Sequence, residues 1–156
     1  MYLPMKLLHI LAVIAFLGNI ATGLFWHVHA ARTRDARILA HTMNGIIRSD
    51  RLFTIPGVVV IIASGITTAV IGGMPLLRTG WILWTLVLFG ISGLIFMAFV
   101  GPLQRRLLAL AQAGSAQGNF DFAAYAKLAR RWEFWGAAAL LTPAAGLVLM
   151  VLKPVL

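Results

Sequence analysis

Histidines are the side chains best suited to chemistry in this sequence, and two of them lie in its first apolar segment. His9 is near the start of that segment, His27 is near its end, and His29 follows. Neutral imidazole is a common ligand of metals and of haem iron. His9 lies among leucine and isoleucine, where an unpaired polar group is costly. We therefore expect a partner for His9: a metal or a haem b iron, a quinone or substrate, or a polar group of a neighbouring helix.

Helical periodicity places both histidines on one face of the first segment, a stripe about 80° wide at about 100° per residue. The stripe otherwise holds small and apolar residues: His9, Ala12, Phe16, Ile20, Gly23 and His27. The two imidazoles would be about 27 Å apart at about 1.5 Å per residue, too far to share one haem. Met150 is expected at the depth of His9 and is a candidate second axial ligand. His27 and His29 are expected at headgroup level, solvated or in contact with a cofactor.

Several other kinds of site are excluded or disfavoured because the residues they need are absent from the chain or lie outside its apolar segments. The chain has no cysteine, which excludes disulfides, thiolate metal sites and a cysteine nucleophile. The apolar segments contain no charged residue, which argues against an ion-coupled transporter. Asp50 and Glu133 lie at segment edges beside Arg51 and Arg130, and we expect interfacial ion pairs or helix-end charges there. Asn19, inside the first segment, is expected to form an interhelical hydrogen bond.

Composition then identifies the surroundings of these residues. Of 156 residues, 61% are apolar and only 11% are charged, whereas soluble proteins average about 45–50% and about 25%. A membrane-spanning helix needs about 20 apolar residues. The sequence predicts an all-α protein, an antiparallel bundle of four transmembrane helices within one integral membrane domain (residues 1–156). The expected spans are 5–28, 52–72, 81–101 and 134–152.

The cations predict the orientation of this bundle. Ten of the 13 Lys and Arg residues lie in the two longer connections: Arg32, Arg34, Arg37, Arg48, Arg51, Arg105, Arg106, Lys127, Arg130 and Arg131. The opposite side has Lys6, Arg78 and Lys153. By the positive-inside rule, we expect an inner-membrane protein with both termini in the periplasm. The net charge of +9 is then explained by topology and anionic lipid, and we expect no nucleic-acid partner.

The two basic connections are also expected to be helical. Apolar residues recur at helical spacing in 35–51, which indicates an amphipathic helix on the membrane surface or an extension of the second span. The third span is expected to restart after Pro102. Residues 113–119, rich in Gly, Ser, Ala and Gln, are interpreted as a flexible linker. Asp121 is expected to cap the helix that enters the fourth span.

Prolines and small residues are expected to bend and pack the helices rather than to take part in chemistry. Pro56 and Pro143 are expected to bend the second and fourth spans, with Thr54 and Thr142 placed to satisfy the freed backbone groups. Small residues at helical spacing permit close helix packing in lipid. They are Ala15 and Gly23 on the first span, Gly65 and Ala69 on the second, and Gly93 and Gly101 on the third.

Two stretches, Lys6–Leu11 and Arg48–Pro56, carry a resemblance to a known family. The sequence resembles an uncharacterised family of bacterial predicted integral membrane proteins, a domain-of-unknown-function family. The resemblance extends through Trp84 and Gly93 to Gln104–Arg106. It implies a multi-pass membrane protein and assigns no activity.

A more distant similarity is to the HemJ and CopD-like membrane proteins, a haem-associated protoporphyrinogen oxidase family and one linked to copper handling. Four residues occupy comparable places: His9, His29, Met43 and Thr54. This similarity implies a haem-binding bundle. The chain departs from HemJ proteins at their characteristic lysine, where it has Thr85, and at a later histidine, where it has Phe96.

Two functional classes follow from the sequence. The first is a redox or haem-binding membrane protein with His9 as axial ligand. The second is a non-catalytic subunit or scaffold that packs with membrane partners or with copies of itself through its small-residue faces. A small-solute channel is disfavoured by the short chain and the absence of charge within the spans. The lipid bilayer is the one expected partner common to all three classes.

Overall fold

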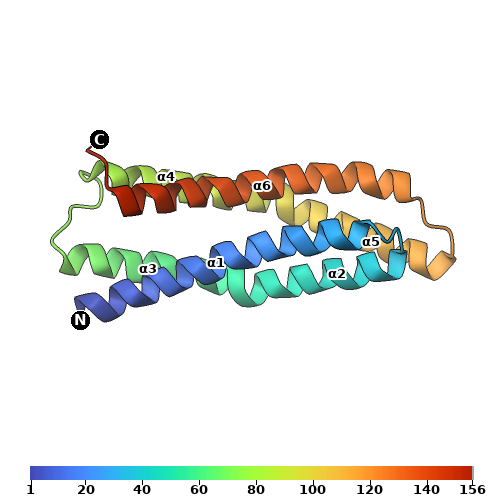
Figure 1. Ribbon diagram of the computed structural model, residues 1–156, viewed down its shortest axis with the longest axis horizontal. Coiled ribbons are helices and arrows are strands. Elements are labelled where there is room, and N and C mark those ends of the chain that lie inside the picture. The colour runs from blue at the N-terminus through green and yellow to red at the C-terminus, as the bar shows by residue number, and fades with distance from the viewer. Residues whose placement is uncertain (156) are drawn as a thin grey trace.

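The computed structural model describes residues 1–155, and these form four long helices joined by short connections (Figure 1). The first and last are continuous: α1 (Tyr2–Ala31) and α6 (Phe122–Leu152). The second and third are each interrupted by one π-helical turn. Their parts are α2 (Ala36–Ser49), η1 (Asp50–Thr54) and α3 (Ile55–Ile71), then α4 (Gly80–Ile95), η2 (Phe96–Val100) and α5 (Gly101–Gln117). The expected all-α architecture with four membrane-spanning helices is confirmed.

All four helices are long and apolar enough to cross a membrane. They contain 30, 36, 38 and 31 residues, about 45–57 Å at about 1.5 Å per residue, and so exceed a hydrocarbon core of about 30 Å. Both termini lie at one end of the bundle, which we call the terminal end (Figure 1). The opposite end, where residues 32–35 and 118–121 connect the helices, is called the basic end.

The extensions expected at the basic end are present. Residues 36–49 do not form a separate surface helix, because α2 continues directly into η1 and α3. Asp121 caps α6 as predicted, since its carboxylate accepts a hydrogen bond from the Ala124 amide at 3.0 Å. The linker expected at 113–119 was wrong. Helix α5 continues to Gln117 and ends at Gly118, whose φ of 65° is readily adopted by glycine.

Each π turn immediately precedes a proline-containing helix. Pro56 and Pro102 lack the backbone N–H that would continue an α-helical ladder. The amides of Ile55 and Gly101 instead reach back five residues, to the carbonyls of Asp50 and Phe96. The wider turn accommodates the proline and redirects the helix.

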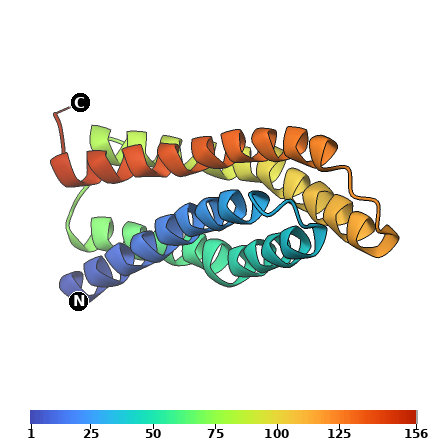
Figure 2. The ribbon, with the colours of Figure 1, turned by 45° about the vertical axis from the view of Figure 1, so that its right-hand side comes forward.

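The helices exchange neighbours at these turns (Figure 2). Towards the basic end α2 packs on α5, whereas towards the terminal end α3 packs on α1 and α4 packs on α6. No Cα atom of α3 lies within 8 Å of one in α4 or α6. The buried core therefore lies mainly in the half of the bundle nearer the basic end, which we call the basic half. It is formed around Leu39, Met43, Leu107, Tyr125 and Trp132.

Pro143 leaves a free carbonyl within α6, but Thr142 does not satisfy it as expected. The missing N–H of Pro143 frees the Ala139 carbonyl, four residues earlier. The hydroxyl of Ser92 on α4 donates to that oxygen at 2.6 Å, while Thr142 donates to Ala138 at 3.1 Å. The freed group is thus satisfied from a neighbouring helix, which ties α4 to α6.

Candidate functional site

Two helix pairs form the terminal half of the bundle: α1 with α3, and α4 with α6. A cavity of about 390 Å³ lies between these pairs, where α3 and α4 are not in contact. Its volume is within the range of small-molecule sites, about 300–1,000 Å³. Apolar side chains of α1 and α3 form one wall, and α4, η2 and α6 form the other. The rings of Phe16 and Phe89 approach across it, with centroids 5.5 Å apart. Gly90 and Gly93 also line it, and a Cβ atom at either glycine would meet no other atom within 4 Å.

Four polar residues meet where the cavity approaches the basic half; we call them the Asp50 cluster: Asn19, Asp50, Thr54 and Gln104. The Asp50 side chain, in a residue only 7% exposed, lies at the centre. Its Oδ1 accepts hydrogen bonds from Asn19 Nδ2 at 3.1 Å and from Thr54 Oγ1 at 2.8 Å. Its Oδ2 accepts one from Gln104 Nε2 at 2.8 Å. Helices α1 and α5 and the turn η1 thus converge on one carboxylate.

This arrangement corrects two expectations. The predicted ion pair between Asp50 and Arg51 is wrong, because Asp50 is buried and Arg51 is exposed. Among residues 1–155, no Lys or Arg nitrogen lies within 4.0 Å of the Asp50 carboxylate. Thr54 donates to Asp50 rather than to a freed backbone carbonyl. The interhelical hydrogen bond expected of Asn19 is confirmed.

The burial of Asp50 has a physical cause that the apolar pattern did not contain. Helix α2 is continuous with α3, so Asp50 lies 14 residues inside a helix rather than at its edge. The four-residue spacing between Asp50 and Thr54, just before Pro56, was the available signal, because residues i and i+4 share a helix face. Gln104, four residues after Val100, gave no comparable signal in the sequence.

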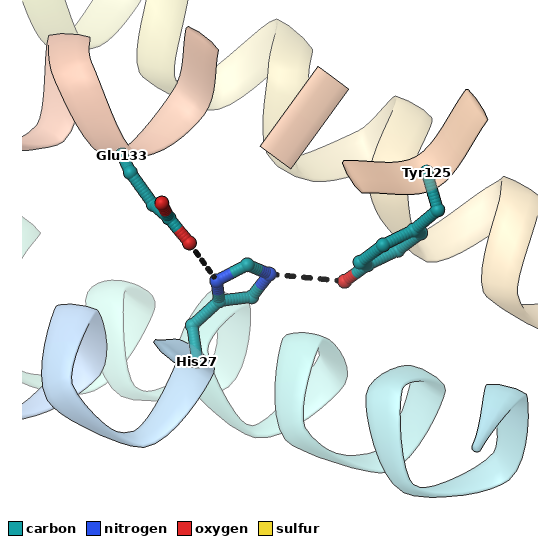
Figure 3. A network of polar contacts seen from close by, with 3 residues as sticks. All are labelled: His27, Tyr125 and Glu133. Carbon is teal, nitrogen blue, oxygen red and sulfur yellow. Dashed lines mark hydrogen bonds and ion pairs between the residues drawn. The ribbon is translucent and has the colours of Figure 1, made fainter. Parts of the chain in front are cut away.

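His27 forms a second buried network, with two residues of α6 (Figure 3). Its Nδ1 lies 3.0 Å from Glu133 Oε1, and its Nε2 lies 3.0 Å from the Tyr125 hydroxyl. Both His27 and Tyr125 are 0% exposed. His27 is therefore not solvated as expected, and Glu133 pairs with His27 rather than with Arg130. Both ring nitrogens of His27 are engaged by protein groups.

The remaining predicted site residues lie apart from this network. His9 is half-buried, and its Nδ1 lies 3.0 Å from the Ile61 carbonyl and 3.3 Å from Ser64 Oγ. The partner on a neighbouring helix, one of the expected alternatives, is thus present. Met150 is half-buried on α6, the neighbour of α4, while His9 packs on α3. His29 is exposed near the basic end.

Gly65 on α3 provides the room for His9. A Cβ atom there would lie 3.0 Å from His9 Cε1, so the small-residue stripe of the second span accommodates an imidazole. No group of three or more His, Cys, Asp or Glu side chains that could hold a metal occurs within residues 1–155. The structure therefore brings Asn19, Asp50 and Gln104 together, but not the predicted set of His9, His27, His29 and Met150.

These helices define a class of protein: an integral membrane protein with four spanning helices. The chain belongs to the family of predicted integral membrane proteins known as DUF2269, whose model matches residues 3–154. No curated protein and no solved structure matches it. The resemblance to an uncharacterised membrane family is thus confirmed, whereas the similarity to HemJ and CopD-like proteins stays a prediction.

Removal of the Tyr125 hydroxyl tests the His27 network. In Tyr125→Phe the fully buried Nε2 of His27 loses its partner, so we expect a loss of about 1 kcal/mol in the free energy of unfolding. Thermal and denaturant unfolding in detergent micelles measure it. Tyr2→Phe, the same change at the terminal end, should alter stability by less than half as much. Equal effects would show that the network does not stabilise the fold.

Proposed function

We propose that the protein binds a lipophilic small molecule in the cavity between its helix pairs. The observation that supports this most strongly is the position of Asp50, a buried carboxylate at the polar end of an otherwise apolar cavity. Ionisable groups at membrane depth are expensive to bury and usually serve a function. An apolar pocket with a few convergent polar groups is also the typical form of a ligand site.

The shape of the cavity favours a ligand that enters from the lipid. Three lining residues on α3 and α4–η2 are also exposed on the surface of the bundle: Val59, Ile62 and Met97. The cavity therefore opens between α3 and α4, towards acyl chains, while its polar end is closed by the packed basic half. Both walls include a π turn, a feature often found at functional sites.

Filling the cavity should abolish binding without harm to the fold. Gly93→Leu places a side chain in open space and removes a helix-destabilising glycine. We expect a diazirine-bearing hexadecanol in phosphatidylcholine bilayers to label Val100 and Ala139 of the unmodified protein. These residues line the cavity but are only 4% and 2% exposed. In Gly93→Leu, labelling at both residues should fall about tenfold, as measured by peptide mass spectrometry.

Gly18→Leu is the matched control. Gly18 is exposed on α1, has no atom within 4 Å of its Cβ position and does not line the cavity. This variant should keep the labelling of Val100 and Ala139 within twofold of the unmodified protein. If neither residue is labelled in the unmodified protein, or if both leucine variants behave alike, the cavity is not a binding site.

We also propose an orientation: an inner-membrane protein with both termini in the periplasm. Ten of 13 cations lie towards the basic end, the distribution of a cytoplasmic side. The absence of cysteine permits a clean test. In cells with an intact inner membrane, an impermeant maleimide should label Val155→Cys and should not label Ser115→Cys until the membrane is disrupted. The reverse pattern would overturn the orientation.

A second candidate function is haem binding at His9. Since a carbonyl only accepts hydrogen bonds, the contact with Ile61 places the proton of His9 on Nδ1 and leaves the Nε2 lone pair free for iron. The visible spectrum of protein purified with haem supplied tests it. We expect a Soret band that is lost in His9→Ala and kept in His29→Ala. A colourless preparation would exclude this function.

The subunit or scaffold function, with copies of the chain or other membrane proteins as partners, has less support. It relied on small-residue faces being free for partners, yet Gly65 packs on His9 and Gly93 faces the cavity. Gly65 is thus used within the chain, and Gly93 borders the proposed ligand site. Of the three candidate functions, we therefore favour ligand binding most and assembly with partners least.

A further inference from the structure

We infer that the molecule held in the cavity is a lipophilic amine with a long alkyl chain. This inference rests on the proposed function and specifies its ligand. It is drawn from two features: an open acceptor position on Asp50 and the absence of a cationic partner for that carboxylate.

The Asp50 carboxylate has one acceptor position left on Oδ2. A carboxylate offers about four lone-pair sites, two on each oxygen. The two sites of Oδ1 are used by Asn19 and Thr54, whereas Oδ2 receives a hydrogen bond from Gln104 alone. Asp50 itself lines the cavity. A donor that enters the cavity thus finds a held carboxylate with one free position.

An ionised Asp50 carboxylate finds no compensating positive charge within the described chain. Its three donors are two amides and a hydroxyl, all neutral. The nearest cations in sequence, Arg48 and Arg51, are exposed. Buried charges in proteins are normally paired with an opposite charge. An ammonium group satisfies both needs of Asp50 at once, because it donates to Oδ2 and neutralises the charge.

The rest of the cavity fits the apolar part of such a molecule. Beyond the Asp50 cluster the lining is aliphatic and aromatic, with Phe16 and Phe89 at the sides and the opening between α3 and α4. A long alkyl chain can therefore extend from the polar end towards the lipid. An anionic amphiphile would bring a second negative charge next to Asp50 and is disfavoured.

The test compares two photoreactive probes on the unmodified protein in phosphatidylcholine bilayers. One is a diazirine-bearing C18 2-amino-1,3-diol; the other is its N-acetyl derivative, which keeps the hydroxyls and lacks the charge. We expect the amine to label Val100 and Ala139, the buried cavity residues, at least tenfold more than the amide. Equal labelling by both probes would overturn the amine assignment while leaving the cavity proposal intact.

One variant assigns the contact. Asp50→Asn should reduce labelling by the amine about tenfold and leave labelling by the N-acetyl probe within twofold, which also shows that the cavity persists. Unchanged amine labelling in Asp50→Asn would refute the role of Asp50. Failure of every probe, including the diazirine hexadecanol, would instead refute the proposed function.

Discussion

Two prolines that cannot donate a backbone hydrogen bond determine the arrangement of this bundle. Within a membrane, each backbone group freed by proline must find another partner. At Pro56 and Pro102 the chain meets this requirement with a π turn. Both turns lie within the second and third of the four long helices. As a result, α3 and α4 run apart from each other towards the terminal end. The cavity, its opening and its polar end all follow from that separation.

The two buried polar networks hold different helices together. The Asp50 cluster joins α1 and α5 through η1, and the His27 network joins α1 to α6. The two networks differ in completeness. His27 has both ring nitrogens engaged, which is the pattern of a structural group. Asp50 keeps an open acceptor position and has no Lys or Arg nitrogen within 4.0 Å, which is why we propose it, and not His27, as the ligand-binding group.

The helices were predictable from sequence because their signals are local. Apolar length predicted four spans, and Asp121 predicted a cap that the structure contains. The site was less predictable, because burial at a π turn depends on how whole helices continue and cross. Asp50 was interpreted as a helix-edge charge because the sequence left open whether residues 35–51 form a separate surface helix or continue into the second span. His27 was expected to be solvated because the contact of α1 with the start of α6, where Tyr125 lies, has no local signal in the sequence.

The excess length of the helices implies that the protein is held together by two different forces. Leu39, Met43, Leu107 and Tyr125, all 0% exposed, lie outside the segments expected to span the bilayer. Their packing is driven by exclusion of water, as in a soluble protein. Between helices in lipid that driving force is absent, and close packing and hydrogen bonds replace it. The same four helices are thus expected to be held together by exclusion of water at the basic end, and by close packing and hydrogen bonds where they cross the bilayer.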